Sequence, residues 1–245
     1  MSEQSDHDEQ YEQAVRDRTE AVRERIRAAG GHDVEIVGVT KGADVDAVRA
    51  AVSAGIRCIG ENFAQEMIPK VRSARSLGLS FESHFIGQLQ TNKVRQLAEV
   101  VDVWQSVDRE AAAEEIARRA PGSRVLVQVN LTGGAGKGGC SPAELDALVA
   151  HAVGLGLEVD GLMTVGPTNL EPTATRAAFR ATRAAVDRLG LRTCSMGMSA
   201  DLEIAVQEGA TLLRIGTAIF GERAVRGTRR ETGGSAPVDH GGRTS

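Results

Sequence analysis

The sequence predicts an α/β fold, a single (β/α)8 barrel of the TIM-barrel class with one extra helix at its N-terminus. Short apolar segments alternate with amphipathic helical segments in one unbroken series, which is typical of a parallel sheet. The apolar segments number eight, the count that closes such a sheet into a barrel, and a length of 245 residues suits one barrel. An open, doubly wound sheet is the structural alternative.

The strands are expected where branched apolar residues cluster and then give way to small or polar residues. In chain order these segments lie within residues 34–40, 56–60, 81–87, 100–107, 124–131, 157–165, 193–199 and 211–217. The last two segments stop abruptly, at Ser199 and at Gly216-Thr217.

The helical segments carry start and stop signals. Residues 11–29 have one apolar stripe, and we expect this first helix to cover one end of the barrel. Asp44 and Asp108 are candidate N-caps, and Ser141 is followed by the proline and glutamate of a typical helix start. The helices between strands are expected within residues 44–55, 61–75, 92–98, 109–120, from 141 onward, 172–189 and 200–208.

One domain accounts for the periodic part of the chain. We expect the barrel to span residues 11–223. Residues 1–10 are predicted to be a disordered N-terminus. Residues 224–245 are rich in Gly, Arg, Ser and Thr without periodicity, and we predict a disordered C-terminal tail.

Composition and charge exclude several classes of function. A net charge of −4 gives no electrostatic support for a nucleic-acid partner. No apolar run approaches the ~20 residues of a membrane helix, and the polar, acidic N-terminus is unlike a signal peptide, so we expect a cytoplasmic protein. Cys58, Cys140 and Cys194 share no zinc or redox spacing, and we therefore expect neither a metal site nor a disulfide framework.

Candidate binding residues gather at the predicted carboxyl ends of the strands, where barrels of this class bind ligands. Gly216 and Thr217 offer N–H groups at a helix start, and Ser199 adds a hydroxyl, so together they form a candidate phosphate cup. Lys41 ends the first strand, which neighbours the eighth in a closed barrel. This arrangement suits pyridoxal 5′-phosphate (PLP), because the amine forms a Schiff base with the aldehyde while the phosphate is held at the other end.

Arg214 is expected near the pyridine ring of such a ligand. A guanidinium there disfavours a proton on the ring nitrogen, and an unprotonated pyridine is a weaker electron sink. The pattern therefore favours little or no carbanion chemistry. Structural roles stay open for each residue: Lys41 could face solvent, Ser199 could cap a helix, Arg214 could pair with a glutamate, and His84 could be a core histidine.

Residues 134–139 match the Gly-x-Gly-x-x-Gly pattern of dinucleotide-binding loops. Such a loop usually opens the first βαβ unit and its third glycine lies in the helix, whereas this one follows the fifth strand and the helix starts beyond it. A glycine follows Lys137, which does not fit a Walker loop. We interpret the segment as a mobile loop from which Lys137 could reach a bound anion.

Several motifs together resemble the pyridoxal phosphate homeostasis protein family, a single-barrel relative of the alanine racemase N-terminal domain. They run in order through nearly the whole predicted barrel: Val39-Thr-Lys41, Gly60-Glu-Asn-Phe63, His84-Phe-Ile-Gly87 with Leu89-Gln-Thr-Asn-Lys93, Gly161-Leu-Met163, Ser195-Met-Gly-Met-Ser199 with Asp201, and Arg214-Ile-Gly-Thr-Ala-Ile-Phe-Gly221. Two departures stand out. Ser83 replaces a frequent aromatic residue, and the loop at 132–139 lacks the family's acidic residue.

The resemblance implies a set of cofactor-binding residues and no catalytic ones. Lys41 would be the Schiff-base lysine. Ser199, Gly216 and Thr217 would lie at the phosphate, Arg214 at the pyridine nitrogen, and Asn62 and His84 around the ring. Met196 is expected as a further cofactor-binding residue. Family members bind PLP and are linked to vitamin B6 balance without an established enzymatic activity.

We therefore expect a PLP carrier or regulator of PLP homeostasis without turnover, with apo PLP-dependent enzymes as possible partners. The alternative is a weak PLP-dependent racemase or deaminase. Two-base racemisation needs a second acid/base, usually a tyrosine from an added domain, and the one tyrosine here is Tyr11 in the first helix. A site without that domain stays open to water, which suits a carrier, and we expect a monomer. A Schiff-base aldolase acting on a phosphosugar is a third hypothesis.

Overall fold

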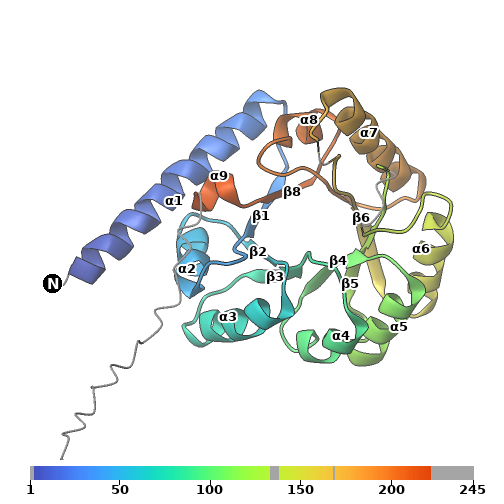
Figure 1. Cartoon of the computed structure of the whole chain (residues 1–245), viewed down its shortest axis with the longest axis horizontal. Coiled ribbons are helices and arrows are strands. Elements are labelled where there is room, and N and C mark those ends of the chain that lie inside the picture. Colours follow the sequence, from blue (N-terminus) through green and yellow to red (C-terminus); the bar gives the residue numbers. More distant parts are fainter. Residues whose placement is uncertain (1–2, 133–137, 168, 222–245) are drawn as a thin grey trace, which may run out of the picture.

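The protein folds as a closed barrel of eight parallel strands that follow one another in chain order, with helices around them (Figure 1). The structure is a computed structural model that describes residues 3–132, 138–167 and 169–221. The predicted TIM-barrel fold is confirmed. The predicted tail at 224–245 lies outside the described residues, and so does Lys137 in the glycine-rich loop.

The strands are β1 (Glu35–Val39), β2 (Cys58–Glu61), β3 (Glu82–Phe85), β4 (Val103–Val107), β5 (Arg124–Gln128), β6 (Glu158–Met163), β7 (Thr193–Ser195) and β8 (Leu212–Ile215). The helices are α1 (Glu3–Ala28), α2 (Val45–Ser53), α3 (Ala64–Ser76), α4 (Thr91–Leu97), α5 (Glu110–Arg119), α6 (Leu145–Gly154), α7 (Pro172–Arg188), α8 (Leu202–Gln207) and α9 (Thr217–Phe220). Within the described residues, none of the helices has the length and apolar character needed to cross a membrane.

Strand β1 closes the barrel by pairing with both β2 and β8. In this register Val37 lies opposite Cys58 of β2 and opposite Arg214 of β8. Residues paired across a sheet point to the same face, so the side chains of Val37, Cys58 and Arg214 all face the barrel interior. The ends of β1 and β8, which the sequence predicts to face each other, are therefore neighbours.

The barrel interior is only partly apolar. One small cluster of apolar side chains fills part of it: Val37, Cys58, Val103, Leu126, Met163 and Leu212. The larger apolar clusters, with Trp104 and Phe179 among their members, include residues of the surrounding helices. Buried polar side chains occupy other positions on the strands: His84, Gln105, Ser195 and Arg214. Bulky branched residues usually fill such a barrel, so the polar group marks a candidate functional region.

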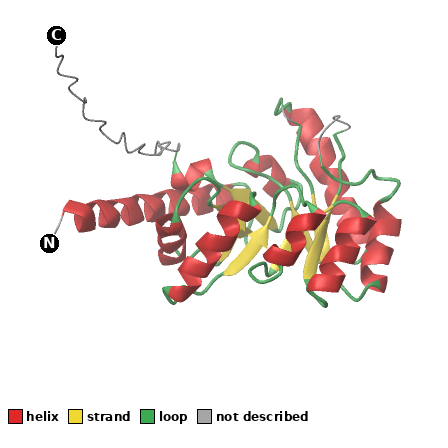
Figure 2. Ribbon diagram, turned by 60° about the horizontal axis from the view of Figure 1, so that its bottom comes forward, coloured by secondary structure: helices red, strands yellow, loops and turns green. Residues whose placement is uncertain are grey.

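The N-terminal helix differs from its prediction in length and place. Helix α1 begins at Glu3 instead of Tyr11, so residues 3–10, expected to be disordered, are helical. Acidic residues near a helix N-terminus favour this extension because they complement the helix dipole. The helix lies along the outer side of the barrel, packed on α2, α8 and α9, and does not cover an end. Figure 2 shows α1 projecting beyond the rest of the barrel.

Candidate functional site

Lys41 lies immediately beyond β1, at the carboxyl end of the barrel. Its side chain is half-buried, and among the described residues it makes no hydrogen bond or ion pair. A Cβ atom on Gly216 would lie 3.4 Å from the carbonyl oxygen of Val39, so the chain after β8 runs against the chain just before the lysine. The structure thus brings together two segments that are predicted to form one site.

The turn that carries Lys41 is held by helix α3. The buried ammonium of Lys70 donates to the backbone oxygen of Thr40, at 2.8 Å, and forms an ion pair with Glu61. The Thr40 hydroxyl donates to the same carboxylate at 2.5 Å, and the backbone N–H of Gly42 donates to Glu66 at 2.6 Å. Burial raises the pKa of Glu61, and Lys70 opposes that rise. The residues on both sides of Lys41 are therefore fixed while its own amine stays free.

Residues of the predicted phosphate cup meet at the start of α9. The Ser199 hydroxyl accepts from the N–H of Ala218 at 3.3 Å, which joins the loop after β7 to the first turn of this helix. Gly216 is the N-cap of α9 and provides no capping side chain. Thr217 is exposed and Gly216 is half-buried. The three predicted residues thus surround one helix N-terminus, where backbone N–H groups favour an anion.

Arg214 lies inside the barrel and is only 5% exposed. Its guanidinium donates through Nη1 to the hydroxyl of Ser195 and through Nη2 to the backbone oxygen of Thr164, both at 2.7 Å. No carboxylate lies within 4.0 Å of it among the described residues. Burial lowers the pKa of Arg214 to about 10 and a nearby carboxylate, Asp201, opposes that shift. The site therefore holds a buried positive charge that is only partly compensated.

Asp201 is the N-cap residue of α8 and is 3% exposed. Its Oδ1 accepts from the backbone N–H of Met198 at 2.6 Å, whereas its Oδ2 is buried without a partner. Burial raises the pKa of Asp201, and Arg214 is among the groups that oppose the rise. An unpartnered carboxylate oxygen near a buried arginine indicates a site with unfilled hydrogen-bonding capacity.

Asn62 follows β2, and its side-chain Oδ1 is buried without a hydrogen-bond partner. Gly87, in the loop after β3, passes so close that a Cβ atom there would lie 1.9 Å from the backbone oxygen of Asn62. Only glycine permits this approach. A buried amide oxygen without a donor is costly, and a ligand that donates a hydrogen bond would remove that cost.

His84 lies deeper in the barrel than predicted. Its Nδ1 is 2.6 Å from the amide nitrogen of Gln105, and its Nε2 is 2.8 Å from Glu82, the first residue of β3. The Gln105 oxygen accepts from the Ser195 hydroxyl at 2.7 Å, and Ser195 in turn accepts from Arg214. His84 is thus linked to Arg214 through two side chains and is turned toward the amino ends of the strands. Its place around the ring stays a prediction.

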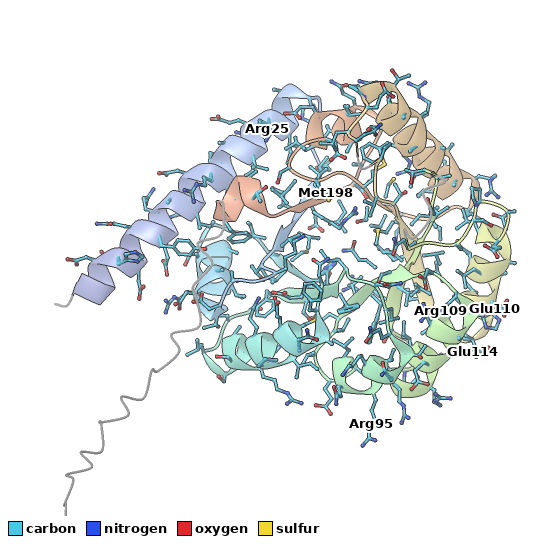
Figure 3. The ribbon with its side chains drawn as sticks, in the orientation of Figure 1. Arg25, Arg95, Arg109, Glu110, Glu114 and Met198 are labelled. Atoms are coloured by element: carbon cyan, nitrogen blue, oxygen red, sulfur yellow. The ribbon has the colours of Figure 1, made fainter. Side chains whose placement is uncertain are left out.

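The structure also separates Met196 from the other predicted residues. Its side chain is fully buried in the apolar layer that includes the surrounding helices, with its sulfur 3.6 Å from that of Cys194. Residues 194 and 196 thus share the outer face of the sheet, opposite to Ser195. Met198, by contrast, is 37% exposed. In Figure 3 it lies near the inner rim of the barrel, unlike a residue of the outer helices such as Arg95, which points outward. The Met196 side chain therefore packs behind the strand and not inside the barrel, and its role as a cofactor-binding residue stays a prediction.

Three buried polar residues of the site have no predicted role: Gln105, Ser195 and Asp201. Gln105 could have been found as one of two polar residues, with Ser106, among the apolar residues of strand β4. Ser195 and Asp201 lie inside a recognised motif, but the motif gives no orientation. A polar residue at an inward-facing strand position is the signal in the sequence that could have indicated these residues.

Comparisons with known proteins identify the family of this chain. The family of the alanine racemase N-terminal domain matches residues 12–224. A pyridoxal phosphate homeostasis protein of Pseudomonas aeruginosa is 42% identical over 215 residues, which cover 82% of this chain and 91% of that protein. A protein of the same name from Aquifex aeolicus is 38% identical, covering 84% of this chain and 97% of its own.

Solved structures share the barrel. PipY of Synechococcus elongatus, determined with PLP bound, is 33% identical with a TM-score of 0.75, and the match covers 84% of this chain and 100% of PipY. An alanine racemase of Streptomyces coelicolor is 26% identical with a TM-score of 0.69, but the match covers only 58% of that enzyme. The motifs, the full-length curated relatives and the shared barrel lead to one conclusion: this chain belongs to the pyridoxal phosphate homeostasis protein family.

Proposed function

We propose that this protein binds PLP reversibly at the carboxyl end of its barrel and takes part in PLP homeostasis as a carrier without turnover of its own. The observation that carries the proposal is the free amine of Lys41 on a segment that runs against the start of α9. The curated relatives are named for PLP homeostasis, and the PipY structure contains PLP. These findings support PLP as the ligand of this site.

The residues present fit this ligand. Lys41 would hold its aldehyde as a Schiff base, and Ser199, Gly216 and Thr217 would hold its phosphate. The unpartnered Oδ1 of Asn62 offers an acceptor for a ligand hydroxyl. When bound, PLP supplies an aldehyde that captures amines and a ring that can accept electrons.

Arg214 favours carriage over catalysis. Its guanidinium stays protonated because even the lowered pKa of about 10 is above neutral pH. A cation at the ring nitrogen disfavours a second positive charge, so the ring remains a weak electron sink. The hydroxyl of Ser195 and the backbone of Thr164 fix the guanidinium where it is. We infer that the site captures PLP without strongly activating a bound amino acid.

The test is an absorbance titration of the full-length chain with PLP, followed by borohydride reduction and peptide mass mapping. We expect one pyridoxyl adduct on Lys41, which Lys41→Ala abolishes. Lys93→Ala is the matched control, because Lys93 is also half-buried, and it should leave the adduct unchanged. Adducts scattered over several lysines would contradict the proposal, and trapping of a phosphosugar instead of PLP would favour an aldolase.

Carrier and enzyme are separated by two further measurements. A carrier should transfer PLP to an apo PLP-dependent enzyme faster than PLP leaves into buffer. An enzyme should exchange the Cα proton of amino acids for deuterium faster than free PLP does, and that result would overturn the carrier. The cytoplasmic location and the monomeric state expected from the sequence stay predictions.

A further inference from the structure

A second cluster of reactive side chains lies at the opposite, amino-terminal end of the barrel. Cys58, Glu82 and His84 each offer one metal-ligand atom, and these atoms lie within 4.8 Å of one another. Cys58 begins β2 and is paired in register with Glu82, which begins β3. His84 is two residues farther along β3, so it faces the same side of the sheet as Glu82. Two adjacent strands thus hold three ligands on a rigid backbone.

We propose that Cys58, Glu82 and His84 bind a zinc-class divalent cation. Thiolate, carboxylate and imidazole are the protein ligands that zinc takes, and a site with three of them keeps a fourth position for water. One thiolate and one carboxylate balance the two charges of the ion. The sequence did not predict this site because the ligands come from separate strands and lack the short spacing of known zinc motifs.

The burial of Cys58 defines the binding step. The Cys58 side chain is only 6% exposed, and a cysteine thiol without a metal is ordinarily protonated at neutral pH. A divalent ion deprotonates a coordinating thiol. Binding therefore forms a bond from the ion to Sγ and releases one proton to solvent. The imidazole stays neutral and moves its proton from Nε2 to Nδ1, so that Nε2 can coordinate.

Both of the other ligands are held by outer partners, as is usual for metal ligands. Arg124 pairs with the carboxylate oxygen of Glu82 that does not face His84. Gln105 holds Nδ1 of His84 at 2.6 Å. With the metal bound, Nδ1 becomes a donor, so the Gln105 amide turns its oxygen toward the ring and its nitrogen toward Ser195.

The cluster has an entry path with the appropriate charge. Glu82 and His84 line a cavity of about 240 Å³ at this end of the barrel. The charged residues that line this cavity, Glu82 included, are four acidic residues and two arginines: Asp33, Glu35, Glu82, Asp160, Arg124 and Arg192. The excess of acidic groups favours a cation over an anion. The cavity also leaves room for the water that would complete the coordination.

The experiment is a titration of the purified, metal-free full-length chain with Co²⁺, without PLP, so that its outcome is independent of the PLP site. We expect one equivalent to bind, with a thiolate-to-cobalt charge-transfer band and the visible bands of a tetrahedral site. Zn²⁺ should displace Co²⁺ and remove both. At constant pH, each ion bound should release about one proton, which follows from the Cys58 thiol.

Matched variants identify the ligands. Cys58→Ser should abolish the charge-transfer band. Cys140→Ser should keep the band, because Cys140 is not one of the proposed ligands. It is the matched control because it is buried to a similar degree, 5% exposed against 6% for Cys58. Gln105→Ala should weaken Co²⁺ binding about 10- to 100-fold, as loss of an outer partner does. Circular dichroism checks the folding of each variant, with Cys58→Ala as a second test.

Three results would overturn the proposal. They are no charge-transfer band in the wild-type chain, a band of equal strength in Cys58→Ser or Cys58→Ala, and loss of the band in Cys140→Ser alone. The wild-type titration decides without any variant, because binding without proton release or without a thiolate band excludes Cys58 as a ligand.

Discussion

Removal of one hydroxyl, in Ser195→Ala, tests the polar network inside the barrel. Ser195 is fully buried; its oxygen accepts from Nη1 of Arg214, and its own proton goes to Oε1 of Gln105. Alanine keeps the backbone and nearly the volume of serine, but it can neither accept a hydrogen bond from Arg214 nor donate one to Gln105. The substitution therefore leaves a charged donor and a neutral acceptor without partners in the barrel interior.

The expected cost follows from those two groups. A hydrogen bond to a charged group contributes about 1.5–3 kcal/mol, and an unsatisfied buried acceptor costs about 1–3 kcal/mol. Water entering the small space left by the hydroxyl would offset part of this, so we expect a loss of about 3 kcal/mol in the free energy of unfolding. For a domain of this size that corresponds to a Tm lower by about 6–12 °C.

Ser106→Ala provides the control. Ser106 is buried next along β4 from Gln105, at 1% exposed, but its hydroxyl has no hydrogen-bond partner. Its removal should change the free energy of unfolding by no more than about 0.5 kcal/mol, or should stabilise slightly. Urea unfolding followed by circular dichroism measures both variants. If Ser195→Ala and Ser106→Ala differ by less than about 1 kcal/mol, the network does not hold Arg214 as argued.

Other predictions concern Glu82, the turn before Lys41 and the loop after β3. Hydrogen bonds from His84 and Arg124 lower the pKa of Glu82 from 4.5 to about 2. The stability that Glu82 contributes is therefore present above pH 4.5 and is lost as the pH falls toward 2. Glu82→Gln should flatten this part of the pH profile of the free energy of unfolding, and an unchanged profile would contradict the assignment. Lys70→Met leaves the charge of Glu61 buried without its partner and should lower the free energy of unfolding by about 3–5 kcal/mol. The double variant Lys70→Met with Glu61→Gln should recover part of this stability in urea unfolding, and no recovery would contradict the assignment of a buried ion pair. Gly87→Ala should destabilise the fold by about 1–3 kcal/mol or more because its Cβ would lie 1.9 Å from a backbone oxygen, whereas Gly154→Ala, with nothing within 4 Å of its Cβ, should be neutral or stabilising in a thermal scan.

The fold could be predicted because each level of the sequence agrees with it. Alternating apolar and helical segments specify the number and order of the elements, and closure of the barrel makes the ends of β1 and β8 neighbours. Helix caps were predicted less exactly. At the sixth helix, the Ser141 hydroxyl does bond the carboxylate of Glu144, but the regular helix begins only at Leu145. Capping interactions of this kind can form in a turn that precedes the helix.

The depth of a side chain in the barrel could not be read from the sequence. His84 faces inward as expected, but how far it lies from the carboxyl ends depends on the tilt and stagger of the strands, which local pattern does not specify. Met196 follows the short strand β7, and alternation from Ser195 places it on the outer face. A motif names residues that recur together, and it does not separate those that touch a ligand from those that pack behind them.

The direction of the hydrogen bonds in the barrel explains why its interior is polar. Arg214 donates to Ser195, Ser195 donates to Gln105, and Gln105 donates to Nδ1 of His84. Because Nδ1 accepts, the ring proton is on Nε2 and is donated to Glu82. The chain therefore leads from a cation near the ligand end to a carboxylate at the opposite end.

Such a chain costs stability, because a buried guanidinium without a carboxylate in contact is incompletely compensated. The cost falls on Arg214, which lies on β8, two residues before the N-cap of α9. An anionic ligand bound there would supply the missing negative charge, and it would bind the folded chain alone. Ligand affinity and folding stability are then two measures of the same compensation, and under the proposed function the polar interior equips this barrel to bind an anionic ligand.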